Sequence, residues 1–117
     1  MIYRFGAVTV DDDTPTAREP ARIVNRSRAF DGTPAWARPE SAPHTPLVPP
    51  QEVSHWGDHV AQVARRYRGR VAAYQLWDEP NLAAHWGNRW VDPAAYAALL
   101  REGAIRIRDA DRGAVVL

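Results

Sequence analysis

Residues 71–86, with the sequence V-A-A-Y-Q-L-W-D-E-P-N-L-A-A-H-W, decide how this chain is interpreted. The segment begins with a short apolar run from Val71 to Trp77, whose length and composition are typical of a buried strand. Two carboxylates follow, Asp78 and Glu79, and Pro80 ends the strand because it has no N–H for a sheet hydrogen bond. The segment therefore predicts a pair of acidic side chains at the carboxyl end of a buried strand.

Two amphipathic helices are expected, one on each side of this strand. From Pro50 to Arg68 a single apolar stripe repeats with helical spacing, and Gly69 suits the helix C-terminus. The second helix is expected to begin at Asp92, a natural N-cap, and to run to about Ala110. Residues 114–117 are typical of the start of another buried strand.

Apolar strands that alternate with helices of ~17 residues indicate parallel strands with helical crossovers. The expected fold class is α/β, a partial (β/α)8 TIM-barrel fragment with about strands 3 to 5 and their crossover helices, over residues 31–117. A doubly wound sheet also fits this order, but neither of the nucleotide-binding glycine motifs occurs. Residues 1–30 form an N-terminal segment with a poor pattern, in which strands are possible at 2–10 and 21–30. Active residues of β/α barrels lie at the carboxyl ends of strands, where the two acids are expected.

Composition excludes several classes of function. The net charge is only +1, although all fifteen basic residues are arginines, so there is no electrostatic argument for a nucleic-acid or membrane partner. No apolar run approaches the ~18 residues of a membrane span, and the first residues do not form a signal peptide. The chain has no cysteine, which excludes disulfides and thiolate chemistry.

A proline-rich segment from Asp31 to Pro50 contains Trp36 and His44. So many prolines exclude a helix or a central strand. Loops longer than ~12 residues in compact domains are usually either functional or disordered. The composition leaves a linker and a binding loop equally open.

The residues around the two acids resemble a known family. Trp77-Asp78-Glu79-Pro80-Asn81 resembles the W-N-E-P-N signature of clan A glycoside hydrolases, β/α-barrel enzymes that include families 5 and 39. The similarity extends to the segments on both sides, R-R-Y-R-G-R-V before the motif and D-P-A-A-Y-A-A-L-L-R-E-G-A after it, and to Gly32–Ala37. It covers about residues 31–117.

This resemblance implies a retaining glycoside hydrolase, with Glu79 as the general acid/base and a carbohydrate as the substrate. Asp78 stands where the clan usually has Asn, and an ionised Asp can accept but not donate a hydrogen bond to a sugar hydroxyl. His85 is expected to bond a hydroxyl, and sugar rings could stack on Trp36, Trp86 and Trp90. No cofactor is implied, and no metal is expected because His85 has no second ligand at zinc-site spacing.

The nucleophile of the clan is a second Glu at the end of a later strand, and no glutamate of this chain is placed for that role. We therefore expect no measurable hydrolysis by the 117 residues alone. The alternative function is a truncated, non-catalytic carbohydrate-binding remnant of such a barrel, which would bind sugar without turnover. A third possibility is a truncated reading frame whose product does not fold stably alone. An incomplete barrel would also leave open sheet edges, which favour self-association.

Overall fold

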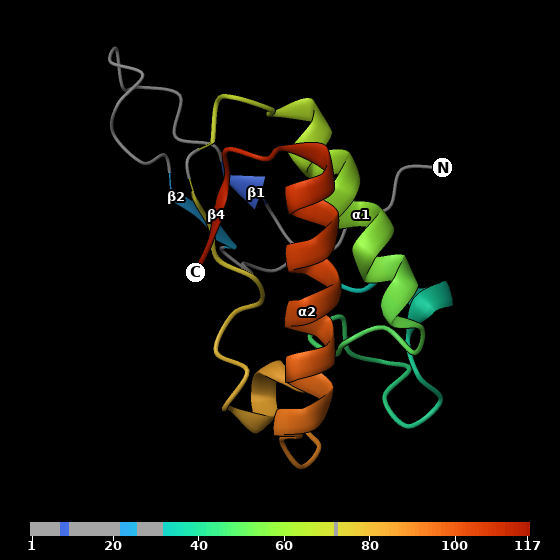
Figure 1. Cartoon of the computed structure of the whole chain (residues 1–117). Coiled ribbons are helices and arrows are strands. Elements are labelled where there is room, and N and C mark those ends of the chain that lie inside the picture. The colour runs from blue at the N-terminus through green and yellow to red at the C-terminus, as the bar shows by residue number, and fades with distance from the viewer. Residues whose placement is uncertain (1–7, 10–21, 26–31, 72) are drawn as a thin grey trace.

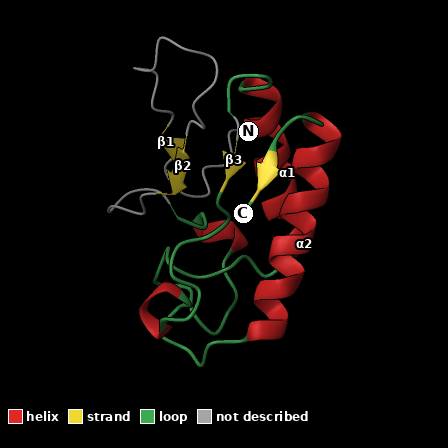
Figure 2. Cartoon of the chain, turned by 60° about the vertical axis from the view of Figure 1, so that its left-hand side comes forward, coloured by secondary structure: helices red, strands yellow, loops and turns green. Residues whose placement is uncertain are grey.

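The computed structural model describes residues 8–9, 22–25, 32–71 and 73–117. Its two long helices, α1 (Val53–Arg66) and α2 (Pro93–Ala110), pack against each other and lie to one side of a small sheet (Figures 1 and 2). The sheet has the order β1-β2-β3-β4, with β1 (Val8–Thr9), β2 (Arg22–Asn25), β3 (Ala73–Tyr74) and β4 (Val115–Val116). Two short 3₁₀ turns, η1 (Ala35–Ala37) and η2 (Ala83–His85), lie in the loops.

Both predicted helices are confirmed, with α1 slightly shorter than expected. The apolar stripe of α1 buries Trp56, Val60 and Ala64, which recur every four residues. Arg65 and Arg66 lie in its last turn, where their positive charges suit the negative end of the helix dipole.

The second helix begins as its capping sequence predicts. The Asp92 carboxylate accepts a hydrogen bond from the Ala95 N–H at 3.0 Å, and proline occupies the first helical position. The buried positions of α2 are Leu99, Gly103 and Ile107. Gly103 is needed for close packing, because a Cβ there would lie 2.6 Å from a Leu76 methyl group.

The end of α2 is tied back to the end of α1 through Asp111, which is 6% exposed. Its carboxylate accepts hydrogen bonds from the Gly69 N–H at 3.0 Å and the Gly113 N–H at 3.2 Å. Gly69 has a φ of 74°, a left-handed conformation that suits glycine. After this turn β4 pairs in parallel with β3, and the Leu117 N–H donates to the Tyr74 carbonyl at 2.9 Å.

The expected partial (β/α)8 barrel, with about strands 3 to 5 and crossover helices, is wrong. Within residues 31–117, where the barrel fragment was expected, the described residues form two long helices and only the two-stranded parallel pair of β3 and β4. Strands typically have ~5–6 residues, but β3 and β4 have two each. The parallel pairing of β3 with β2 and β4 therefore forms a small mixed sheet beside two dominant helices.

The apolar run from Val71 to Trp77 explains the error. Among the described residues of this run, only Ala73–Tyr74 lies in a ladder, while Leu76 and Trp77 are buried without being in a strand. At Trp77 the φ is 65°, so the backbone leaves the extended region. The run is apolar because it fills the core, and a buried irregular segment has the same composition as a buried strand.

The predicted strands at 2–10 and 21–30 fall largely outside the described residues, which include β1 and β2 within them. The proline-rich segment is described from Gly32 onward and packs onto the rest of the chain. Val48 is fully buried, and the Gly87 N–H donates to the Leu47 carbonyl at 2.6 Å. This part of the chain is therefore not a free linker.

Candidate functional site

The motif that follows β3 adopts an unusual backbone conformation. Trp77 and Glu79 have positive φ values of 65° and 42°, in the left-handed region that side chains other than glycine rarely occupy. Each such residue costs on the order of 1–3 kcal/mol and persists where the surrounding structure dictates it. Residues of this kind cluster at functional sites, so the conformation motivates a functional hypothesis for the turn.

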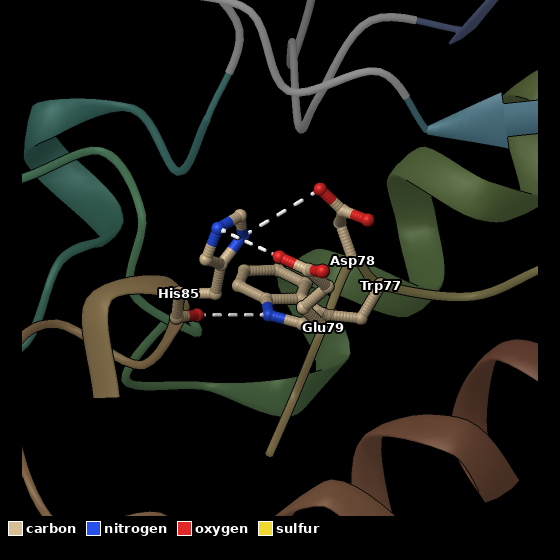
Figure 3. A network of polar contacts seen from close by, with 4 residues as sticks. All are labelled: Trp77, Asp78, Glu79 and His85. Carbon is tan, nitrogen blue, oxygen red and sulfur yellow. Dashed lines mark hydrogen bonds and ion pairs between the residues drawn. The ribbon is translucent and has the colours of Figure 1, made fainter. Parts of the chain in front are cut away.

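The Trp77 indole holds this turn in place. Its ring meets those of Trp56 and Trp86 edge to face, with centroid separations of 5.6 and 6.0 Å. Its Nε1–H donates to the backbone carbonyl of His85 at 3.0 Å, as Figure 3 shows. The start of the turn and the loop eight residues later are thereby joined through one buried side chain.

This arrangement brings Asp78, Glu79 and His85 together (Figure 3). The imidazole Nδ1 lies 3.6 Å from an Asp78 carboxylate oxygen, and Nε2 lies 3.3 Å from a Glu79 carboxylate oxygen. The side chain of His85 is 21% exposed and that of Asp78 is 32% exposed, whereas Glu79 is 56% exposed. Glu79 is therefore the member of the cluster that a ligand can reach most easily.

The three side chains also include the atom types that bind metal ions. One ligand atom from each residue lies within 4.8 Å of the others. The two carboxylates, however, approach different nitrogens of the same imidazole, and one ion would need both carboxylates beside one nitrogen. As arranged, the cluster fits an imidazole held between two acids better than a metal centre.

The three tryptophans predicted to bind sugar lie in different environments. Trp86 is 2% exposed, and its ring packs against Trp77 and Tyr96, so neither face is open to a ligand. Trp36 is 51% exposed and meets the His55 ring edge to face at 4.8 Å. Trp90 is 95% exposed.

Two tyrosines of the core border the turn. The Tyr96 hydroxyl donates to the Leu76 carbonyl at 3.2 Å, and burial raises the pKa of this tyrosine. Tyr74 lies in β3, and burial, followed by the negative charge of Asp111, raises its pKa to about 12. Both phenol groups are therefore uncharged near pH 7.

Arg89 and Gln51 are not among the residues that the sequence predicts for the site. Both line a cavity with Trp90, on the side of the loop where the proline-rich segment packs. In the sequence, the only local indication of this cavity is an arginine next to a tryptophan. Gln51, two residues before α1, gives no such indication. Their juxtaposition depends on how two distant loops pack.

No protein-family model matches this chain, and a comparison with curated proteins also found no match. The helices in the described part of the chain include none that is long and apolar enough to cross a membrane.

Proposed function

We propose that this chain carries the general acid/base of a glycoside hydrolase, and that this group is Glu79. The supporting observation is the anchored turn, which presents a largely exposed glutamate beside a second carboxylate and an imidazole. The similarity of the W-D-E-P-N motif to the clan A signature supplies the type of reaction. The proposal concerns the site and does not depend on a barrel.

In the first step protonated Glu79 gives its proton to the glycosidic oxygen as a nucleophile attacks the anomeric carbon and the aglycone leaves. In the second step the Glu79 carboxylate removes a proton from water, which attacks the anomeric carbon and releases the sugar and the nucleophile. His85 holds the Glu79 carboxylate through Nε2, at 3.3 Å. Asp78 would accept a hydrogen bond from a sugar hydroxyl.

The nucleophile is not Asp78. In retaining enzymes the two carboxyl groups lie on opposite sides of the scissile bond, ~5–5.5 Å apart. Asp78 and Glu79 are adjacent in sequence and both hold His85, so Asp78 does not lie across a sugar from Glu79. The proposal therefore assigns only the acid/base role within this cluster.

An external nucleophile tests this role directly. Phenyl β-glycosides of glucose, galactose, xylose and mannose are incubated with the chain in the presence of azide. Azide displaces the aglycone at the anomeric carbon, and Glu79 gives its proton to the leaving oxygen. We expect azide-dependent release of phenol from at least one of them, with the glycosyl azide identified by NMR.

Glu79→Gln should lower this azide-dependent rate by at least ~100-fold, since general acid catalysis typically contributes 10²–10⁴-fold. Glu40→Gln is the matched control, because Glu40 is an exposed glutamate of the proline-rich segment and is not a member of the cluster. It should retain the rate of the unaltered chain. Absence of glycosyl azide, or equal rates for both variants, would contradict the proposal.

Carbohydrate binding without turnover is the second candidate, and the fully exposed Trp90 beside a cavity favours it. It predicts saturable sugar binding, no glycosyl azide, and an affinity that Glu79→Gln leaves nearly unchanged.

A further inference from the structure

The C-terminal ends of α1 and α2 lie side by side (Figures 1 and 2). The Gly69 N–H, which follows α1, donates to the Asp111 carboxylate, which follows α2, at 3.0 Å. This bond joins two segments, 65–70 and 108–112, although 42 residues separate its partners in the sequence. The arginines of the two segments are all exposed, and we call the surface that they form the arginine surface: Arg65, Arg66, Arg68, Arg70, Arg108 and Arg112.

The arginine surface has a charge that the nearly balanced composition conceals. Its two segments contain six arginines and two aspartates, Asp109 and Asp111, which give a net charge of +4. Because the whole chain carries only +1, the rest of the sequence carries −3. The two helix ends add partial negative charges of about −0.5 each, which leaves the surface positive. The distribution of charge therefore supplies the argument for an anionic partner that the net charge does not.

Most of these arginines are not neutralised by neighbouring acids. Elsewhere on α2, Arg106 lies 3.3 Å from an Asp58 oxygen and 2.9 Å from a Glu102 oxygen, so its charge is paired. Asp111 is 6% exposed, and its carboxylate accepts backbone N–H groups. Within the described residues no ion pair is formed by the following arginines: Arg65, Arg66, Arg68, Arg108 and Arg112. Their guanidinium groups are therefore available to an external anion.

The chemistry of the arginine surface matches phosphate groups on the outside of a double helix. A guanidinium presents a planar fork of N–H donors that binds two phosphate oxygens at once. None of the exposed side chains in segments 65–70 and 108–112 is apolar or aromatic. Apolar side chains would be needed to enter a lipid surface, and aromatic side chains to stack on unpaired bases. A duplex needs neither, because its phosphates are exposed and its bases are stacked inside.

The surface also has a suitable size for a duplex. Two packed helices with axes 8–10 Å apart present ends that are together roughly 20 Å wide. Over that width a duplex carries about ten charges, one per ~1.7 Å of its axis. Several phosphates can therefore face the arginines at the same time.

We propose that the arginine surface binds the phosphate backbone of double-stranded nucleic acid without sequence preference. The surface lies at the end of α2 opposite to loop 83–92 (Figure 1), and a helix of 18 residues is ~27 Å long. It shares no residue with the cluster of Asp78, Glu79 and His85. The inference therefore goes beyond the proposed function and does not depend on it.

Fluorescence anisotropy with labelled duplexes of 20 base pairs tests the proposal, with two unrelated sequences and sodium chloride from 25 to 200 mM. We expect equal affinity for both sequences. Affinity should decrease with salt, with a slope of log K against log[salt] of about −3 to −5, because each phosphate contact contributes ~0.9. Arg68→Gln and Arg112→Gln each remove one contact, from different segments. Each should reduce the slope by ~0.9 and lower the affinity on the order of 10-fold at 50 mM salt.

Ser54→Glu is the matched control, because it also changes the net charge by one unit but lies in the first turn of α1. Its position is ~16 Å along the helix from Arg65, which exceeds the screening length of ~10 Å at 0.1 M salt. It should bind like the unaltered chain. Circular dichroism checks that each variant retains its helices.

The proposal is wrong if neither duplex binds at 25 mM salt, or if the affinity does not depend on salt. It is also wrong if Ser54→Glu weakens binding as much as Arg112→Gln, since the net charge would then be the cause. Tighter binding to single strands, to phosphatidylserine vesicles or to heparin at the same salt concentration would overturn the assignment to a duplex. Glu79→Gln should bind the duplex normally, so this result is independent of the azide test.

Discussion

The hydroxyl of Tyr74 is buried in β3 and has no hydrogen-bond partner among the described residues, although the residue is only 2% exposed. A buried donor without a partner costs about 1–3 kcal/mol relative to its hydrated state. Tyr74→Phe removes the hydroxyl and keeps the ring that packs in the core. We therefore expect this variant to be more stable than the unaltered chain, by about 1–2 kcal/mol at pH 7.

The gain should increase in alkaline solution. The pKa of Tyr74 is about 12 in the folded chain, against 10.0 for a tyrosine side chain fully exposed to water. Below pH 10 both states hold the proton, and between pH 10 and 12 only the unfolded state loses it. Stability of the unaltered chain therefore falls across this window, by about 2–3 kcal/mol, since one pKa unit corresponds to ~1.4 kcal/mol. Tyr74→Phe lacks this contribution.

Urea unfolding followed by tryptophan fluorescence at pH 7, 9, 10, 11 and 12 measures both effects. Tyr96→Phe is the informative comparison, because its hydroxyl does have a partner, the Leu76 carbonyl. That variant should lose about 1 kcal/mol at pH 7, the opposite sign from Tyr74→Phe. If Tyr74→Phe is equal to or less stable than the unaltered chain at pH 7, the hydroxyl has a partner and the reasoning fails.

Two further substitutions test the packing beneath the site by the same measurement. Leu99→Ala empties a position that is 2% exposed in α2 and should cost about 2–5 kcal/mol of unfolding free energy; a loss under ~1 kcal/mol would show that the helix is not packed there. Gly103→Ala places a Cβ 2.6 Å from Leu76 and 3.0 Å from Trp56, so it should destabilise the chain by about 1–3 kcal/mol despite alanine's better helix propensity. A more stable Gly103→Ala variant would contradict the close approach.

The helices could be predicted because their signals are local. The four-residue spacing of buried side chains and the Asp92-Pro93 start can be recognised without knowing what the helix packs against. Their lengths followed from the same patterns. The strand pairing could not be predicted in this way, because a ladder needs a partner, and the apolar run ending at Trp77 fits a buried turn equally well.

The candidate site was predictable in part. The adjacency of Asp78 and Glu79 is in the sequence, but the position of His85 depends on a positive φ at Trp77, which no residue preference signals at tryptophan. Trp86 and Trp90 are the same residue type four positions apart in one loop. One is buried against aromatic rings and the other is exposed, and only the packing of the loop distinguishes them.

Trp77 packs in the core and also positions Glu79. Two residues with positive φ cost the turn roughly 2–6 kcal/mol in total. Burial of one large aromatic side chain contributes about 1.5–3 kcal/mol, and its two edge-to-face contacts add about 0.5–1.5 kcal/mol each. The packing of Trp77 is therefore comparable in size to the strain of the conformation that presents Glu79. Because the indole also bonds the His85 carbonyl, core packing and the carboxylate–imidazole geometry are a single structural unit.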